Sequence, residues 1–349
     1  MRFNQQLNGT KKFQIWVNKD FLTVIGWSGC TVSEKCLLTP ERGKKMLQLS
    51  LIPSVAEERQ RRLSIFEKLP GNGISKIVDT ASVSELKIYR GGSGIWYDKD
   101  STGSLVAESP GVTVSVLHTG SSYPPNYLSA DGILYPYPLI TGSLRGKISL
   151  EATKTAGHLG VPVFTVSYTK RNSSERLVSI GWVEGWDDAL SRFLIAFGYD
   201  QPPQLIHEVS VDSVPFSWRT ATRKELRESV ALRSGESRFH FQVMRRYDGM
   251  CCMCEFKVQE MLVPVHIRPR DEGGSDDPRN GLLLCPLHSA SFKQGLIGIE
   301  PETLTIRHMA LGPTLEDLKI TKVSLSGIPL QPHPDAFRWH WGKWSLLYL

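Results

Sequence analysis

The hydrophobic positions are grouped most regularly between residues 84 and 200. Short apolar runs recur there between Gly, Pro and Ser, as in ELKIYRG, GVTVSVLHTG, VPVFTVSY and VSIGWVEGW. Runs of this length, rich in β-branched and aromatic residues and bounded by turn residues, predict strands. One segment, ISLEATKTAGHLG, places Leu150, Ala152, Ala156 and Leu159 on roughly one face and predicts a helix. We therefore predict a β-rich domain with one helical interruption.

The flanking regions have a different pattern. Before the β-rich stretch, apolar runs such as FLTVIGW precede a charged helical stretch, VAEERQRRLSIFEKL, and PGNG at 70–73. QPPQ at 201–204 indicates a linker, and LIGIEPETLTIRH after Gly295 predicts a strand pair. The patterns divide the chain into an N-terminal α/β extension (1–75), a β-rich domain (76–200), a basic linker (201–236), a second domain (237–310) and a C-terminal tail packed on it (311–349).

Composition and charge describe an ordinary soluble protein with room for more than one core. Of the 349 residues, 40% are hydrophobic and 22% charged, and the net charge of +6 suits a polyanionic partner without establishing one. Between Ser217 and Arg246 lie eight basic and three acidic residues, a local excess that nearly matches that of the whole chain. A solvated helix face and a phosphate-facing surface explain this segment equally well.

Nothing in the apolar pattern predicts contact with a membrane. No apolar run approaches the ~18–20 residues of a membrane span. The N-terminal sequence MRFNQQLNGTKKFQ lacks the apolar centre of a signal peptide. We therefore expect a cytoplasmic protein.

Four of the six cysteines are crowded between Cys251 and Cys285. In a reducing compartment such clusters bind metal more often than they form disulfides. Cys251 and Cys254 form a C-x-x-C pair, and Cys285 and His288 form a C-x-x-H pair. Two such pairs, about thirty residues apart, supply the four ligands of a tetrahedral structural Zn²⁺ site. Cys252 is a rival ligand, but its spacing to Cys254 does not suit such a pair.

His266 lies between the two pairs, in VPVHIRPRDEGGSDDPRNG, and Asn280 follows it across a Gly/Asp loop. With Y-D-G-x-C-x-x-C before it and N-G-L-L-L-C-x-x-H after it, the segment resembles the HNH (ββα-metal) nuclease family. The resemblance implies that His266 is the general base that activates water and that Asn280 fixes the loop that orients it. It also implies one divalent metal, such as Mg²⁺, Mn²⁺, Co²⁺ or Ni²⁺, at the scissile phosphate. The zinc ligands would then only staple the ββα element.

Two positions depart from the family pattern. Family members usually have His and Asp, as ligands of the catalytic metal, where this chain has Ser289 and Lys293. Serine is a poor ligand for a divalent metal, and a lysine ammonium repels the ion, so the metal site looks degenerate. His288 could serve this metal instead, which would leave the zinc with three protein ligands.

The β-rich half carries a second resemblance. GVTVSVLHTGSSYPPNYLSADGILYPYP and EATKTAGHLGVPVFTVSY resemble an SRA domain, over roughly residues 84–198. The match is closest to SRA-like domains joined to HNH nucleases in McrA-type, modification-dependent restriction endonucleases. It implies a curved, PUA-like β-barrel or sheet that flips a modified cytosine and stacks it between Tyr123 and Tyr135. The acid that reads the base edge is replaced by Asn126, with Asp131 as a nearby alternative. Without the resemblance, Tyr123 and Tyr135 would be interpreted as core or strand-surface aromatics and not as base-stacking residues.

Together these patterns predict an α+β protein in which an SRA-like domain precedes a zinc-stapled HNH domain. The predicted function is a modification-dependent endonuclease that flips 5-methyl- or 5-hydroxymethylcytosine in double-stranded DNA and hydrolyses phosphodiester bonds. We assign phosphate contacts to Arg268 and Arg270 beside the base, and to Arg245 and Arg246 at the end of the basic segment.

Two other functions compete with the nuclease. A reader that binds modified DNA without cutting it is favoured by Ser289, Lys293 and Asn126. A structural assembly protein without nucleic-acid contact is disfavoured by the basic segment and by both resemblances. The oligomeric state stays open, with a homodimer among the options.

Overall fold

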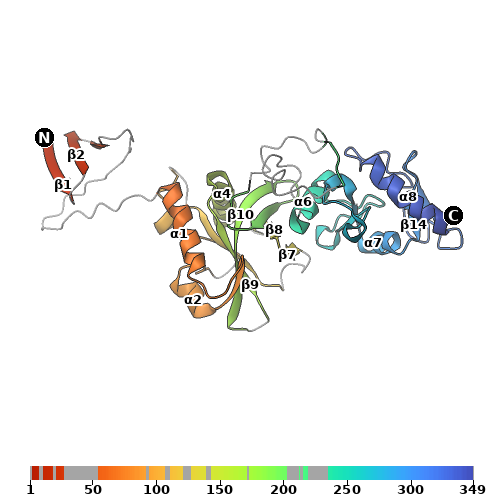
Figure 1. The fold of residues 1–349 in the computed structure, drawn as a ribbon, viewed down its shortest axis with the longest axis horizontal. Helices are drawn as coiled ribbons and strands as arrows, with labels where there is room; N and C mark the ends of the chain where they lie inside the picture. Colours follow the sequence, from red (N-terminus) through yellow and green to blue (C-terminus); the bar gives the residue numbers. More distant parts are fainter. Residues whose placement is uncertain are drawn as a thin grey trace. The chain divides into compact units, whose positions relative to one another are not determined.

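The computed structural model describes residues 2–7, 11–18, 21–26, 54–91, 94–106, 111–120, 127–138, 143–170, 173–202, 212, 215–218 and 235–348. The chain divides into two compact units, residues 1–51 and 52–349. In the first unit, three strands pair antiparallel in the order β1-β2-β3 (Figure 1): β1 (Arg2–Leu7), β2 (Lys11–Asn18) and β3 (Phe21–Gly26).

The second unit begins with a mixed sheet. Its strands are β4 (Ser75–Asp79), β5 (Ile95–Tyr97), β6 (Thr113–His118), β7 (Leu128–Ser129), β8 (Gly132–Pro136), β9 (Val163–Tyr168), β10 (Glu175–Asp187) and β11 (Arg192–Phe197). They pair in the order β5-β6-β9-β10-β11-β8-β7, with β4 also on β10, and only β6 and β9 run parallel. Among the described strands, β5 and β7 at the two ends are not paired with each other. The sheet is therefore open, and the expected barrel is not confirmed.

Helices cover both faces of this sheet (Figure 1): α1 (Val55–Glu67), α2 (Thr80–Glu85), α3 (Lys99–Thr102) and α4 (Leu144–Leu159). Phe66 of α1 packs in one core with Leu117 of β6, whereas Ala156 of α4 packs in another core with Val116, the residue before it. Because successive residues of one strand enter different cores, the strands are buried on both faces. This explains why their sequences read as continuous apolar runs without strict alternation.

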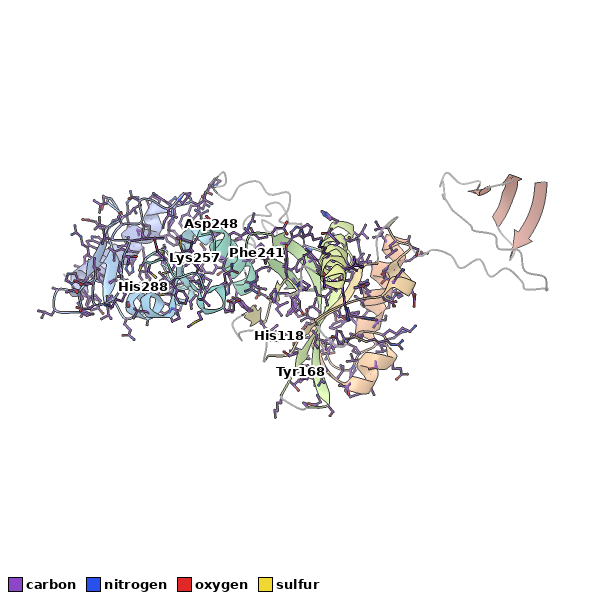
Figure 2. The ribbon with its side chains drawn as sticks, turned by 180° about the vertical axis from the view of Figure 1, so that it is seen from behind. His118, Tyr168, Phe241, Asp248, Lys257 and His288 are labelled. Carbon is purple, nitrogen blue, oxygen red and sulfur yellow. The ribbon has the colours of Figure 1, made fainter. Side chains whose placement is uncertain are left out.

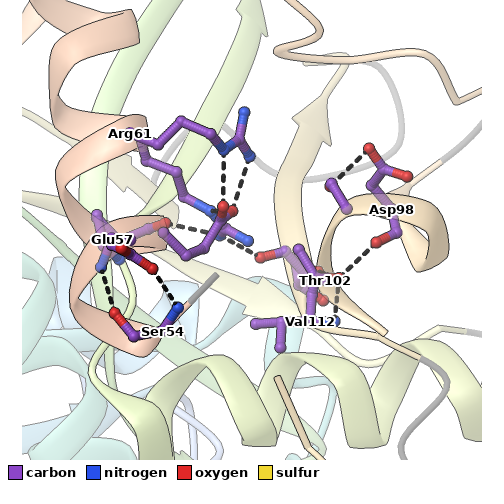
Figure 3. A network of polar contacts seen from close by, with 11 residues as sticks. Ser54, Glu57, Arg61, Asp98, Thr102 and Val112 are labelled. Atoms are coloured by element: carbon purple, nitrogen blue, oxygen red, sulfur yellow. Dashed lines mark hydrogen bonds and ion pairs between the residues drawn. The ribbon is translucent and has the colours of Figure 1, made fainter. Parts of the chain in front are cut away.

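A polar network anchors α1 to the sheet (Figure 3). Ser54 and Glu57 form a reciprocal capping box at the start of the helix. One turn on, the buried Glu58 pairs with the buried Arg62, with 2.7 Å between Oε1 and Nε. Arg62 Nη1 also donates to the carbonyl oxygens of Thr113, at 2.6 Å, and Pro162, at 2.8 Å. The charged stretch predicted as a helix is thus fixed against β6 and the residue before β9.

The C-terminal part contains a ββα element. Its members are β12 (Val263–His266), β13 (Gly281–Leu284) and α7 (Pro286–Lys293). The further elements are α6 (Glu236–Arg246), β14 (Ile297–Ile299), β15 (Ile306–His308), α8 (Pro334–Tyr348) and the 3-10 helices η5 (Gln259–Met261), η6 (Arg270–Glu272) and η7 (Pro278–Asn280). β12 pairs with β13 and β14 with β15, both antiparallel, which confirms the strand pair predicted after Gly295.

Helix α6 joins the ββα element to the mixed sheet. Its Phe239 and Val243 share one core with Leu134 of β8, Leu194 of β11 and the residues of β12 and β13. The same helix carries Arg238, which forms a buried ion pair with Glu184 of β10. The sheet and the ββα element are therefore packed through one continuous core. None of the described helices is long and apolar enough to cross a membrane.

Candidate functional site

The two cysteine and histidine pairs meet at one point. The ligand atoms of Cys251, Cys254, Cys285 and His288 all lie within 4.8 Å of one another. His288 Nδ1 is 3.3 Å from Cys251 Sγ and 3.3 Å from Cys285 Sγ. Its Nε2 lies 3.0 Å from the carbonyl oxygen of Leu318, which requires the ring proton on Nε2 and leaves the lone pair of Nδ1 facing the sulfurs. This cluster could hold a tetrahedral metal ion such as zinc.

The local fold explains why His288 points to the sulfurs. Cys285 is the N-cap of α7 and Pro286 its first residue, so His288 lies in the first turn, near Cys285. Figure 2 labels His288 in the C-terminal part of the chain. Burial acts to raise the pKa of the Cys251 thiol, whereas backbone hydrogen bonds from Met253 and Cys285 act to lower it. Thiolate is the form that binds metal. Cys252 lies outside the cluster, buried, and its backbone N–H donates to Leu283.

A second cluster is centred on His266, at the end of β12 and opposite Gly281 of β13. His266 Nε2 lies 3.1 Å from Asp276 Oδ1, and its ring is stacked on Phe239, with 3.8 Å between the centroids and 8° between the planes. Arg270 Nε donates to the same Asp276 oxygen at 2.6 Å. The imidazole is thus held at one edge and on one face.

Asn280 holds the loop between His266 and β13. Its side chain is fully buried, and its Oδ1 accepts a hydrogen bond from the Arg268 N–H at 2.9 Å. Its Nδ2 donates to the carbonyl oxygens of Arg268 and Ser275, both at 2.9 Å. These bonds tie both ends of the loop to one side chain. A residue that orients the loop beside His266 would make such bonds, and the catalytic role of Asn280 stays a prediction.

His266 lines a cleft of about 640 Å³. Its walls come from α6, β12, α7 and α8 and include aromatic side chains and charged ones. The aromatic residues are Phe239, Phe292, Trp339, Trp344 and Tyr348, and the charged ones are Glu236, Arg270, Glu272, Lys293 and Lys343. Of the aromatic residues, Phe239, Phe292 and Trp344 are buried in the walls, and Lys343 pairs with Glu272.

The donors beside His266 do not fit a divalent metal. Ser289 is 5% exposed on α7, and Lys293 places an ammonium group at the cleft. The carboxylate that contacts His266 already accepts from Arg270 and from the Gly235 N–H. Within the described residues, the cysteine cluster is the one place where three or more metal-binding groups meet. His288 belongs to that cluster, so the alternative in which it serves a catalytic metal does not agree with its orientation.

The four arginines assigned to phosphate have different surroundings. Arg268 lies between the rings of Trp218, at 4.8 Å, and Trp339, at 5.4 Å, and Arg270 is half-exposed at the cleft. Arg245 pairs with Asp187 of β10. The Arg246 side chain is only 6% exposed and is bonded to Asp212 and to the Gln331 carbonyl oxygen. Arg246 therefore serves the fold in this structure.

The predicted base pocket is only partly visible. Tyr123 and Asn126 lie outside the described residues. Tyr135 is 1% exposed, and its hydroxyl donates to the Leu117 carbonyl oxygen at 3.1 Å, so it is a core side chain here. Asp131 accepts from the Ser129 hydroxyl and from the Ser237 N–H at the start of α6. Its carboxylate thus bonds the first turn of α6, and its role in base recognition stays a prediction.

Two residues of the His266 cluster were missed by the sequence reasoning. Asp276 is one of two adjacent aspartates in GGSDDPRN, and no spacing rule separates it from Asp277. Asp277 pairs with Arg279 instead. Phe239 comes from α6, far along the chain from His266, and no local pattern links the two rings.

Comparison with known proteins agrees with the ββα element. Residues 251–300 match the family model described as HNH endonuclease. No curated protein matches the chain. Among solved structures, "Modification dependent TagI restriction endonuclease" is similar at 18% identity and a TM-score of 0.31, covering 79% of this chain and 94% of that one. "Structure of the Type IV phosphorothioation-dependent restriction endonuclease ScoMcrA" is similar at 14% identity and a TM-score of 0.25, covering 68% of each chain.

Proposed function

We propose that this protein is a DNA endonuclease in which His266 activates the attacking water. The observation that carries the proposal is the arrangement around His266, whose ring is fixed by Asp276 and Phe239 at the wall of an open cleft. The match of residues 251–300 to the HNH endonuclease family supports it. A positioned imidazole typically contributes ~10²–10⁴ in rate as a general base.

The hydrolysis step needs a base and positive charge at the phosphate. His266 takes a proton from water, the water oxygen bonds to phosphorus, and one P–O ester bond breaks, with its oxygen taking a proton from solvent. Arg270 and Lys293, both lining the cleft, bring positive charge for the developing negative charge. The donors beside His266 do not fit a divalent metal, so the positive charge in this step comes from these side chains.

The finer proposal concerns the substrate. We assign modified cytosine in double-stranded DNA to the SRA-like sheet, which would flip the base and stack it against Tyr123, with Asn126 at its edge. The sequence resemblance over roughly residues 84–198 supports this assignment. The continuous core through α6 supports a fixed placement of this sheet relative to His266. Tyr135 and Asp131 are left out, because both are used within the fold.

The competing function is a reader that binds modified DNA without cutting it. Ser289 and Lys293 favour this candidate, since neither provides the metal ligand that the family uses. The two functions are separated by incubating one plasmid, in methylated and unmethylated forms, with the protein alone and with Mg²⁺, Mn²⁺, Co²⁺ or Ni²⁺. Cutting of the methylated form supports the nuclease, and binding without any cutting supports the reader. The cytoplasmic location and a homodimeric state stay predictions.

A further inference from the structure

The carboxylate of Asp276 is the meeting point of three donors. Oδ1 receives His266 Nε2 at 3.1 Å and Arg270 Nε at 2.6 Å, and Oδ2 receives the Gly235 N–H at 3.0 Å. The side chain is only 9% exposed. A carboxylate with both oxygens bonded and little contact with water is held in one orientation, and it holds its partners in turn.

This contact decides which nitrogen of His266 carries the proton. Burial acts to raise the pKa of the Asp276 carboxyl, but the bonds from His266 and Arg270 outweigh it and lower the pKa below its ordinary value. The carboxylate is therefore ionised at neutral pH and can only accept hydrogen bonds. Nε2 must then be the protonated nitrogen, and in the neutral ring the lone pair belongs to Nδ1.

The rest of the cluster keeps the ring in this orientation. Phe239 covers one ring face, and the backbone of β12 is fixed by pairing with β13. Gly281, opposite His266, leaves room for the stack. A Cβ at this position would lie 2.5 Å from Val243 Cγ2 and 2.9 Å from Phe239 Cζ.

We propose that Asp276 is the positioning residue of the site: it fixes His266 as the Nε2–H tautomer, so that Nδ1 takes the proton from water, and it holds the Arg270 guanidinium beside the ring. The proposal rests on the nuclease function proposed above. Arg270 lies beside the imidazole, because Asp276 Oδ1 contacts both Arg270 Nε and His266 Nε2. The side chain of Arg270 is 46% exposed, so the part of the guanidinium that does not contact Asp276 can meet a phosphate.

Other ionisable groups line the same cleft, and their titration would also contribute to the pH dependence of kcat. They are Glu236 and His240 on α6, Glu272 in the loop, Lys293 on α7, and His340 and Lys343 on α8. Burial lowers the pKa of both His240 and His340 to about 4, so both rings are neutral near pH 7.

The direct test is the tautomer of His266 in the full-length, zinc-loaded protein. Long-range ¹H–¹⁵N spectra of histidine-labelled protein, with His266 assigned from the His266→Gln variant, should show a proton on Nε2 and an unprotonated Nδ1. A proton on Nδ1 would overturn the proposal. This measurement needs no DNA and no activity, so it stands apart from the proposed function.

The variant Asp276→Asn provides the second readout, with Asp271→Asn as the matched control because Asp271 is an exposed carboxylate in the same loop. An amide can donate to Nε2 as well as accept from it, so the Nε2–H tautomer loses its advantage. We expect kcat to fall by about ten-fold to a hundred-fold, which is part of the ~10²–10⁴ that a general base contributes, while KM and zinc content stay close to those of the natural protein.

The two readouts separate the possible failures. An unchanged tautomer and an unchanged kcat in Asp276→Asn contradict the positioning role. If the natural protein shows the Nε2–H tautomer but His266→Ala cuts DNA equally well, the nuclease role of His266 fails while the Asp276 contact stands. Should Asp276→Asn not fold, the spectrum of the natural protein decides alone.

Discussion

Phe239 lies parallel to the imidazole of His266, with 3.8 Å between the ring centroids and 8° between the planes. Phe239 belongs to α6, whose opposite contacts reach Leu134 and Leu194 of the mixed sheet. The ring that covers the candidate base therefore sits on the helix that joins the two parts of the fold. A change in the packing of α6 should therefore shift the Phe239 ring and with it the imidazole of His266.

The first prediction uses the space between β13 and α6. Gly281→Ala would place a methyl group 2.5 Å from Val243 Cγ2 and 2.9 Å from Phe239 Cζ. Overpacking of this kind costs roughly 1–3 kcal/mol, and here it displaces the ring stacked on His266. We expect a lower free energy of unfolding and a lower kcat. Gly327→Ala is the control, because nothing lies within 4 Å of a Cβ there. Equal losses of stability and kcat in both variants would contradict the close packing of Val243 and Phe239 against Gly281.

The second prediction concerns the metal. The purified protein should contain about one zinc per chain. Cys254→Ser should lose the zinc and lower the melting temperature, because three ligands remain. Cys252→Ala should keep it, since Cys252 lies outside the cluster. Metal analysis and thermal unfolding of the three proteins check this. A folded natural protein without zinc, or loss of zinc in Cys252→Ala alone, contradicts the ligand set.

The third prediction tests the junction between the sheet and α6. Glu184 and Arg238 form a buried ion pair, with 2.7 Å between Oε1 and Nε. Removing Glu184 takes from Arg238 its hydrogen-bonded carboxylate and leaves only the charges of Asp131 and Asp276 near it, and breaking a buried pair typically costs about 3–5 kcal/mol. Glu184→Gln should therefore be strongly destabilising in denaturant unfolding. The double variant Glu184→Leu with Arg238→Met should recover most of the loss. A double variant as unstable as the single one would mean that the pair is not the source of the effect.

The fourth prediction is the acid dependence of stability. The pKa of Asp276 is lowered in the folded protein from its ordinary value of 3.8, so the unfolded chain binds this proton more readily. The carboxylate contributes stability above pH 3.8, and the contribution is lost as the pH falls through the lower folded pKa. Thermal unfolding as a function of pH should show this loss in the natural protein and in Asp271→Asn. In Asp276→Asn the loss of stability at low pH should be smaller. The same loss in this variant as in the natural protein would contradict the contact between Asp276 and its partners.

Much of the local structure was predictable from the sequence. The C-x-x-H spacing was enough to bring Cys285 and His288 together within one helical turn, and the prediction that both pairs share one site is met by the four ligand atoms. The helix carrying Ala156 and the strand pair after Gly295 followed from local apolar patterns. Such features depend on neighbours within a few residues, and hydrophobic periodicity reports them well.

The features that depend on distant contacts were not predictable. Asp276 meets His266 only because Asn280 folds the intervening loop, and Asp131 caps α6 although it lies more than a hundred residues away. Arg246 belongs to a basic segment in the sequence, but its side chain is buried and pairs with Asp212, which no local pattern indicates. The sequence left a barrel and a sheet as alternatives, since strands buried on both faces have the same apolar pattern in both.

Cleavage of one plasmid in methylated and unmethylated forms, by the natural protein and by His266→Ala, tests the central claim most directly. Because Ser289 and Lys293 leave no divalent site beside His266, the natural protein should cut the methylated form slowly. Adding Mg²⁺ or Mn²⁺ should raise the rate in the double variant Ser289→His with Lys293→Asp, whose new ligands are four residues apart on α7. His266→Ala should lose nearly all cutting while keeping zinc and DNA binding, in line with the ~10²–10⁴ of a general base. Cutting by His266→Ala at the natural rate would contradict the account.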